Sequence, residues 1–461
     1  MYYVVLGNTA QLSAGDSLAF FRRWTAISAT LLLSSFLIAQ APDKPTAVAR
    51  KALDLLLAEK YPELRTMFTA AAKDRLTADF LRDRVTSEIH TFGQLNAISD
   101  PVTAQDGDNT LVSFPVHFAT TRVYIQFTLD SSLQVSGLYL RPLNAPLPKV
   151  WQRPAYSKPD AFTQREVTIG SDEWKLGGAI TVPVGKGPFP GVVLVHGPGP
   201  HDRDEEIYSN RVFRDIAEGL ASRGIAVLRY DKRTLTYAEK MGEAAFTLEQ
   251  ETVEDAVRAI GVMRSQPEVA ANRIYLLGHS LGGYAAPRIA AKDGKLAGLI
   301  FFAANARPIE DVALDQYEYV AHLDGNPSPQ VQQRLDALKA EVGKVKALEP
   351  GKPPPQVLLG LPGAYVLDLK GYDPAQQAKR LTIPMLFLQG GRDFQITSKD
   401  LEAWKAALAS RRNVQFKEYP ALNNVFIAGE GKPGPADYMK QGNVDPTVID
   451  DIATWIAHPA N

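Results

Sequence analysis

The spacing of apolar residues changes along the chain and predicts two folded parts of different class. Apolar residues first recur at helical spacing, between residues 48 and 85. They then alternate with polar or small residues over 112–118 and 123–129, and more loosely over 134–140. Helices followed by an antiparallel meander predict a small α+β domain over residues 43–142.

A proline-rich segment follows this domain. Residues 143–162 contain Pro146, Pro148, Pro154 and Pro159. Proline restricts the backbone, so the segment is expected to be a stiff linker. It also carries two aromatic residues, Trp151 and Tyr156, that are available for docking.

From residue 163 to residue 461 the pattern indicates a second, larger domain. Short, continuously apolar runs alternate with segments of helical periodicity. Runs of this kind are typical of parallel strands that are buried on both faces. The repeated alternation predicts a doubly wound, mostly parallel α/β sheet. The expected strands are residues 191–195, 225–230, 274–278, 296–303 and 383–388.

The regular alternation breaks between about residues 304 and 380. Helical patterns, three consecutive prolines and a short apolar stretch replace it. Insertions at the carboxyl ends of parallel strands commonly cover a binding site. We therefore expect a helical cap here, and we expect it to select the substrate.

The expected strand 274–278 leads directly into Gly278-His279-Ser280-Leu281-Gly282, and a helical pattern follows. Strand, sharp turn and helix, with serine at the turn, make a nucleophile elbow. The two glycines leave room for the close approach of strand and helix. Ser280 is therefore the predicted nucleophile.

Three further segments resemble motifs of one known superfamily. They are His196-Gly-Pro-Gly-Pro-His-Asp-Arg-Asp-Glu205, Gln389-Gly-Gly-Arg-Asp393-Phe-Gln395 and Leu422-Asn-Asn424. Together with the elbow, they resemble the α/β-hydrolases, in particular bacterial secreted carboxylesterases and serine aminopeptidase-like hydrolases. The resemblance covers roughly two-thirds of the chain. The small domain in turn resembles the nuclear-transport-factor-like modules that precede some bacterial hydrolases.

The resemblance implies an α/β-hydrolase fold with a catalytic triad and an oxyanion hole. Asp393 is then the triad acid. The oxyanion hole is expected from the loop Gly197–Gly199 and from the N–H of Leu281.

Two positions depart from the family pattern. Asn424 stands where the family has the general-base histidine, and a carboxamide has no basic lone pair near neutral pH. Pro198 stands where the family usually has serine, and proline has no N–H to offer an oxyanion. The only histidine after Asp393 is His458, which follows an expected C-terminal helix.

Composition excludes several kinds of chemistry. The chain has no cysteine, so disulfides, thiol catalysis and thiolate metal sites are ruled out. Its formal net charge of -1 gives no electrostatic reason to bind nucleic acid. No phosphate-binding or dinucleotide motif occurs, so no cofactor is expected. His201, Asp202, Asp204 and Glu205 offer metal-ligating atoms, but their spacing matches no known zinc or calcium motif.

The N-terminus predicts export. Arg22 and Arg23 precede a short apolar run that ends near Ile38, and Ala39-Gln40-Ala41 follows. A basic region, a short apolar region and an Ala-x-Ala site are typical of a secretory signal peptide over residues 1–41. The expectation is a secreted or periplasmic protein without a membrane anchor after cleavage. An uncleaved anchor is the alternative.

The sequence therefore predicts a serine hydrolase of small carboxylic esters that acts through an acyl-enzyme. Because Asn424 occupies the base position, this chain is expected to be inactive or an inactivated variant, natural or engineered. Two alternatives remain open: a peptidase or amidase of the same fold that acts on short peptides, and a non-catalytic, ligand-binding pseudo-hydrolase. The oligomeric state is left undetermined.

Overall fold

The computed structural model describes residues 44–142 and 151–459, apart from short gaps at 107, 120, 172, 244–245 and 350. The chain forms two compact units, which divide between Ala145 and Pro146. We call them the N-terminal unit and the C-terminal unit. The expected signal peptide lies outside the described residues.

Helices precede strands in the N-terminal unit, as expected. The helices are α2 (Lys44–Leu57), α3 (Tyr61–Thr66), α4 (Ala70–Arg75), α5 (Ala78–Phe80), the π-helix Leu81–Thr86 and α6 (Ser87–Thr91). The strands are β1 (Leu95–Ile98), β2 (Val102–Asp106), β3 (Asn109–Phe118), β4 (Arg122–Leu129) and β5 (Val135–Pro142). The sheet is antiparallel in the order β1-β3-β4-β5, and β2 also pairs with β3.

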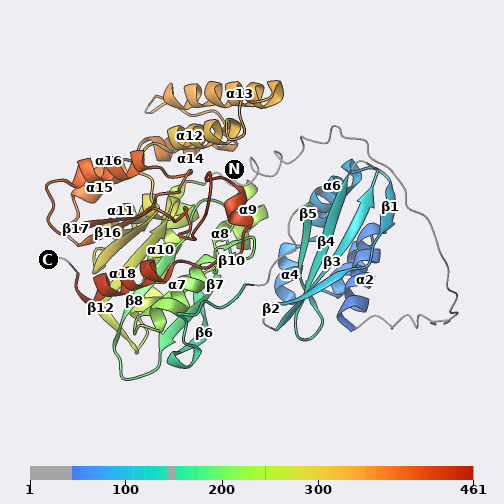
Figure 1. Cartoon of the computed structure of the whole chain (residues 1–461), viewed down its shortest axis with the longest axis horizontal. Coiled ribbons are helices and arrows are strands. Elements are labelled where there is room, and N and C mark those ends of the chain that lie inside the picture. Colours follow the sequence, from blue (N-terminus) through green and yellow to red (C-terminus); the bar gives the residue numbers. More distant parts are fainter. Residues whose placement is uncertain are drawn as a thin grey trace, which may run out of the picture. The chain divides into compact units, whose positions relative to one another are not determined.

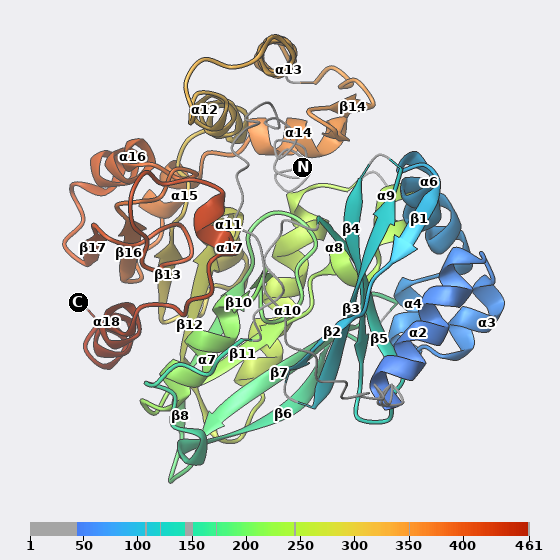
Figure 2. The same ribbon diagram turned by 45° about the vertical axis from the view of Figure 1, so that its right-hand side comes forward.

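Three strands were expected in this unit, and the sheet has five. The two additional strands, β1 and β2, are mostly exposed and lack the alternation that marks a half-buried strand. The pattern of apolar residues in these two segments therefore did not predict strands. The helices of this unit pack on one face of the sheet (Figure 2). The core between them includes Leu53 and Leu56 of α2 and the sheet residues Phe114, Ile125 and Phe127.

The C-terminal unit is built on an eight-stranded sheet in the order β17-β16-β13-β12-β8-β11-β7-β6. The six strands from β17 to β11 run parallel, and β7 and β6 add antiparallel pairs at one edge. The strands are β6 (Phe162–Ile169), β7 (Leu176–Pro183), β8 (Phe189–Val195), β11 (Ala226–Tyr230), β12 (Val269–His279), β13 (Gly298–Phe302), β16 (Met385–Gly390) and β17 (Val414–Tyr419).

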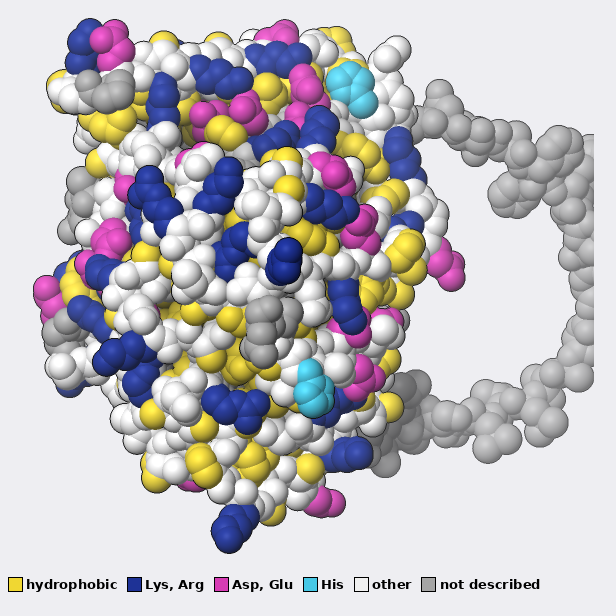
Figure 3. Space-filling view, turned by 90° about the vertical axis from the view of Figure 1, so that its left-hand side faces the viewer, with side chains coloured by type: hydrophobic (Ala, Val, Ile, Leu, Met, Phe, Trp, Pro, Cys, Tyr) yellow, Lys and Arg dark blue, Asp and Glu magenta, His cyan; other side chains and the backbone are white. Residues whose placement is uncertain are grey.

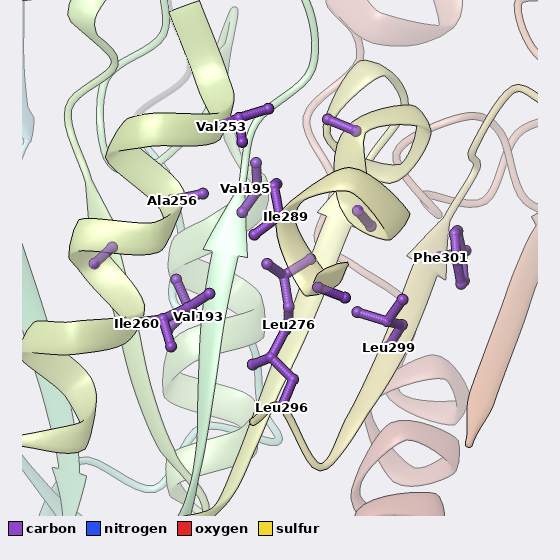
Figure 4. Close-up of a cluster of buried hydrophobic side chains, with 14 of the residues drawn as sticks. Val193, Val195, Val253, Ala256, Ile260, Leu276, Ile289, Leu296, Leu299 and Phe301 are labelled. Atoms are coloured by element: carbon purple, nitrogen blue, oxygen red, sulfur yellow. The ribbon is translucent and has the colours of Figure 1, made fainter. Parts of the chain in front are cut away.

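Helices cover both faces of this sheet (Figure 1). On one face, α10 (Glu254–Arg264), α11 (Leu281–Asp293) and α16 (Ser398–Leu408) bury a core that includes Val193, Ile260, Leu276 and Phe301 (Figure 4). On the other face, α7 (Val212–Ala221) and α18 (Pro446–Ala457) bury a second core. Because strands such as β8 are apolar on both faces, only a layer on each side can bury them. The expected doubly wound α/β architecture is confirmed.

Shorter elements complete the C-terminal unit. They are the 3-10 helix Pro159–Ala161, β9 (Glu206–Ile207), β10 (Asn210–Arg211), α8 (Arg233–Thr236), α9 (Ala238–Glu243), the π-helix Glu249–Val253 and α17 (Ala436–Met439).

Between β13 and β16 the chain forms the helical insertion that the broken alternation indicated. It comprises α12 (Ile309–Ala321), α13 (Pro329–Lys346), β14 (Val357–Leu358), β15 (Leu361–Pro362), α14 (Gly363–Lys370) and α15 (Pro374–Lys379). A small core of its own includes Val342, Val345 and Val366. We call the segment from α12 to α14 the cap.

The second half of the expected linker is anchored to the C-terminal unit. The indole Nε1 of Trp151 donates to Asp215 Oδ1 at 2.8 Å, and the hydroxyl of Tyr156 donates to the Val444 carbonyl at 2.9 Å. Arg153 forms an ion pair with the buried Glu218. The anchoring shows that both aromatic residues do dock, as their presence in the linker suggested.

The surface of the C-terminal unit shown in Figure 3 carries basic and acidic side chains intermixed, with apolar atoms between them. Within the described part of the chain, no helix is long and apolar enough to cross a membrane.

Candidate active site

Ser280 lies on a strained turn between the central strand β12 and helix α11. Its φ of 49° and ψ of -113° are costly for a residue with a side chain. A Cβ on Gly282 would lie 2.3 Å from the Val195 carbonyl oxygen, and one on Gly278 would lie 2.4 Å from the Gly282 backbone. Glycine is therefore required on both sides of the serine. The half-buried Ser280 side chain does not cap α11.

The loop after β8 borders Ser280. A Cβ added to Gly197 would lie 3.6 Å from the Ser280 Cβ. The Gly197 N–H donates to Glu205 Oε1 at 2.7 Å, and the Gly197 carbonyl accepts from Lys232 Nζ at 2.8 Å. Both backbone polar groups of Gly197 are thus already engaged, and its N–H is directed at a carboxylate.

The rest of this loop is held through its carbonyl groups. The Pro198 carbonyl lies 2.9 Å from His201 Nε2, and the Gly199 carbonyl accepts from the Thr234 hydroxyl at 3.0 Å. Pro198 and Pro200 have no N–H. Among residues 197–200, Gly199 is therefore the one whose N–H makes no hydrogen bond to another described residue. At the elbow, the N–H of Leu281 belongs to the first turn of α11, where no carbonyl of the helix can accept it.

Asp393 lies in the loop that follows β16 and is buried. Its Oδ1 accepts from the backbone N–H groups of Gln395 and Ile396 at 2.8 and 2.9 Å. Its Oδ2 accepts from Asn424 Nδ2 at 2.8 Å. Burial raises the pKa of Asp393 to about 7, and the hydrogen bond from Asn424 acts in the opposite direction.

Asn424 follows β17 and is held at both ends of its carboxamide. Its Nδ2 donates to Asp393, and its Oδ1 lies 3.0 Å from His279 Nε2. Its side chain thus makes the contact to Asp393 that the N–H of a triad histidine would make. The carboxamide oxygen is directed at His279 and carries no basic lone pair.

His279 and Glu205 form a buried ion pair beside the nucleophile. His279 Nδ1 lies 2.9 Å from Glu205 Oε2, and both side chains are at most 5% exposed. Burial lowers the pKa of His279, but the Glu205 carboxylate outweighs it and the net direction is upward. The pKa of Glu205 falls to about 2 despite its burial, because His279 lies against it. Nε2 of His279 is directed at Asn424 Oδ1 and Nδ1 at Glu205, so both ring nitrogens are engaged with groups other than Ser280.

The role of His279 and Glu205 was missed at the sequence level. In the sequence, His279 stood out only as part of the elbow, and Glu205 only as one of four residues with metal-ligating atoms. Within the described residues, no three histidine or acidic side chains gather as metal ligands. Asp204 instead pairs with Arg229, while Glu205 pairs with His279.

No other histidine of the C-terminal unit is placed as a base. His196 Nε2 lies 3.0 Å from the Asp202 carbonyl of its own loop, and burial lowers its pKa to about 3. His322 Nδ1 lies 2.9 Å from the Glu318 carbonyl in the cap. His201 contacts the Pro198 carbonyl, as described above.

His458 lies at the far end of the sheet. It follows α18, whose Ile456 carbonyl accepts from the Tyr275 hydroxyl. Tyr275 precedes Ser280 by five residues on β12, and five strand residues span roughly 16 Å. This contact places the end of α18 away from Ser280 and argues against His458 as its base.

Three charged residues, Asp231, Lys232 and Arg233, follow the end of β11. Asp231 pairs with Arg203, Lys232 with Glu251, and Arg233 with Asp255. The cluster is therefore a set of internal ion pairs.

A serine on a strand-to-helix turn at the centre of a mostly parallel sheet, beneath a helical insertion, defines an α/β-hydrolase. Residues 188–361 match the family model described as serine aminopeptidase, S33. The chain is 42% identical over 346 residues to the esterase EstD of Thermotoga maritima, a match covering 75% of this chain and 79% of that protein. The chain belongs to the same family of α/β-hydrolase esterases.

Solved structures of esterases are also similar. Est1E from Butyrivibrio proteoclasticus is 17% identical, with a TM-score of 0.42 over 63% of this chain and 97% of that chain. An esterase from Pyrococcus furiosus is 14% identical, with a TM-score of 0.41 over 68% of this chain and 97% of that chain.

Proposed function

We propose that Ser280 is the nucleophile of a carboxylic ester hydrolase site whose turnover is slow because Asn424 occupies the position of the base. The observation that carries the proposal is the bridge from Asp393 through Asn424 to His279. Asp393 is thereby held where the acid of a triad would lie, and the position of the base is filled by a carboxamide, which accepts no proton.

In the proposed reaction, Ser280 Oγ attacks the ester carbonyl, the alcohol leaves, and an acyl-serine forms. Water then attacks the acyl-serine and releases the carboxylic acid. The N–H groups of Leu281 and Gly199 are the proposed oxyanion donors, because the N–H of Gly197 is directed at Glu205. Both steps require removal of a proton, from serine and then from water. Without a base, both are slow.

The substitution Asn424→His tests the proposal. An imidazole there can donate to Asp393 and receive the Ser280 proton, so hydrolysis of p-nitrophenyl butyrate should rise by about 10²–10⁴-fold. The gain should appear mainly in kcat, because a general base acts in the transition state. The matched control is Asn424→His with Ser280→Ala, which should be as slow as the unchanged protein. A rise in rate that survives Ser280→Ala would exclude Ser280 as the nucleophile.

Pro198→Ser tests the oxyanion hole separately. In the Asn424→His background, a new N–H at position 198 should raise kcat by about 10²-fold if the proline removes a donor. An unchanged rate would indicate that Gly199 and Leu281 already suffice. If neither substitution, alone or combined, produces hydrolysis, the non-catalytic, ligand-binding alternative is correct.

A peptidase or amidase is the second candidate. It is favoured by the family description, serine aminopeptidase, over residues 188–361. Aminoacyl anilides and p-nitrophenyl esters, compared on the Asn424→His protein, distinguish the two. We propose the ester, and a higher kcat/KM for an anilide would reverse the assignment.

We also propose that the protein is exported and cleaved after Ala41. Support comes from the basic residues, the apolar run and the Ala-x-Ala site near the N-terminus. N-terminal sequencing of protein expressed in a bacterial host should begin at Pro42. An intact N-terminus in the membrane fraction would favour an anchor instead.

A further inference from the structure

A continuous set of polar contacts connects the cap to the loop beside Ser280. In the cap, the hydroxyl of Tyr365 on α14 donates to Glu251 Oε2. The other oxygen of Glu251, Oε1, accepts from Lys232 Nζ at 2.6 Å. The same ammonium group donates to the Gly197 carbonyl at 2.8 Å. Lys232 therefore binds the loop with one proton and the carboxylate that holds the cap with another.

The members of this connection are buried. The side chains of Lys232 and Glu251 are 3% and 6% exposed, and Tyr365 is 4% exposed as a residue. Electrostatic contacts shielded from water are stronger, and removal of one partner leaves the other unsatisfied. Glu251 lies in the π-helix Glu249–Val253, a geometry that is often found at functional sites.

The loop side of the connection continues to the nucleophile. Gly197, whose carbonyl accepts from Lys232, is also held by its N–H, which donates to Glu205. Glu205 in turn pairs with His279, the neighbour of Ser280. The position of Gly197 is thus determined from both sides. It sets the direction of the following residues up to Gly199, the proposed oxyanion donor.

We propose that Lys232 is a positioning residue that couples the seating of the cap to the geometry of the oxyanion loop. When the cap is seated, Tyr365 holds Glu251, Glu251 holds Lys232, and Lys232 holds the Gly197 carbonyl. This inference rests on the proposed function for its effect on catalysis. Its effect on the loop itself does not depend on catalysis and can be measured separately.

The neighbouring ion pair provides a matched control. Arg233 and Asp255 are as deeply buried as Lys232 and Glu251, with side-chain exposures of 2% and 1%. Within the described residues, neither contacts the loop 197–199 through a hydrogen bond or an ion pair. If the two ion pairs only stabilise the fold, removal of either pair should affect the loop 197–199 and kcat similarly. If Lys232 positions the loop, only removal of the Lys232–Glu251 pair should do so.

The first measurement is amide hydrogen exchange of the loop in the full-length chain. The double variant Lys232→Met with Glu251→Gln removes both charges together, so no lone charge is left buried. Exchange in a peptide containing residues 197–199 should become at least tenfold faster. In the control, Arg233→Met with Asp255→Asn, it should stay within about threefold of the parent. Unchanged exchange in the first variant would overturn the inference, whether or not the protein has activity.

The second measurement is kinetic, in the Asn424→His background. The Lys232/Glu251 variant should lose about tenfold or more in kcat with little change in KM, whereas the Arg233/Asp255 variant should keep its kcat within threefold. Tyr365→Phe, which removes one hydroxyl group, should lower kcat by a smaller factor than the Lys232/Glu251 variant does. It should also make amide exchange in the loop 197–199 faster. Equal losses of kcat in the two paired variants would overturn the inference. If Asn424→His alone is inactive, the proposed function fails. The hydrogen-exchange experiment then still tests whether Lys232 and Glu251 hold the loop 197–199.

Discussion

The pair formed by Glu205 and His279 makes a prediction about stability that can be worked out from the structure. Glu205→Gln keeps an oxygen for the Gly197 N–H but removes the negative charge that raises the pKa of His279. The pKa of Glu205 falls from its ordinary 4.5 to about 2 in the folded protein. That difference corresponds to roughly 3 kcal/mol, because one pKa unit is worth about 1.4 kcal/mol. Breaking a buried ion pair typically costs a similar amount, about 3–5 kcal/mol.

The sign of the pH dependence follows from the two pKa directions. The folded-state pKa of Glu205 is lowered, so its contribution is present above 4.5 and is lost as the pH falls towards 2. The folded-state pKa of His279 is raised, so its contribution is present below 6.5 and is lost as the pH rises through the folded value. The difference in stability between the parent and Glu205→Gln should therefore be largest between about pH 4.5 and 6.5.

Tryptophan fluorescence during urea or thermal unfolding measures this difference in the C-terminal unit. Of the five tryptophans, Trp151, Trp174, Trp404 and Trp455 lie in that unit, and Trp24 lies outside the described residues. At pH 5.5 the variant should melt about 5–10 °C lower.

The matched control is Glu268→Gln, whose partner Arg165 is 40% exposed, as Glu268 is. It should change stability by less than about 0.5 kcal/mol. A loss below about 1 kcal/mol for Glu205→Gln, or a loss that is constant from pH 3 to pH 6, would refute the reasoning.

Three further predictions follow from the geometry. Gly282→Ala should destabilise the C-terminal unit by roughly 3 kcal/mol, because its Cβ would meet the Val195 carbonyl. The control is Gly261→Ala on α10, where an added Cβ meets no neighbouring atom; it should stabilise the C-terminal unit by about 0.5–1 kcal/mol. Urea unfolding measures both changes, and equal effects of the two substitutions would contradict the packing argument. Limited proteolysis should cut within residues 143–150 and leave residues 151–161 on the C-terminal fragment, because Trp151 and Tyr156 are bonded to that unit. N-terminal sequencing of the fragment locates the cut. A cut after Tyr156 would contradict the prediction. In the Asn424→His background, His458→Ala should leave kcat unchanged, because the end of α18 is bonded to Tyr275, five residues before Ser280. A tenfold loss would show that His458 reaches the site.

Local patterns were sufficient for most of the fold of the C-terminal unit. The apolar run before Ser280 and the glycines around it predicted the turn, because strand burial and close backbone approach are encoded within ten residues. The cap was recognised by the loss of alternation. The exposed strands β1 and β2 were not recognised, because a strand without a buried face has no periodic signal.

The elbow at Ser280 and the absence of histidine at position 424 can be recognised without a structure, since both are properties of single residues and their neighbours. Which groups these residues contact depends on the folded arrangement of distant segments. His279 and Asn424 are 145 positions apart, and Lys232 meets Gly197 across 35. Glu205 was one of several acidic residues in a polar loop until folding placed it against His279. Partner choice of this kind depends on which loops the sheet brings together at its carboxyl edge, and no local pattern of residues contains that information.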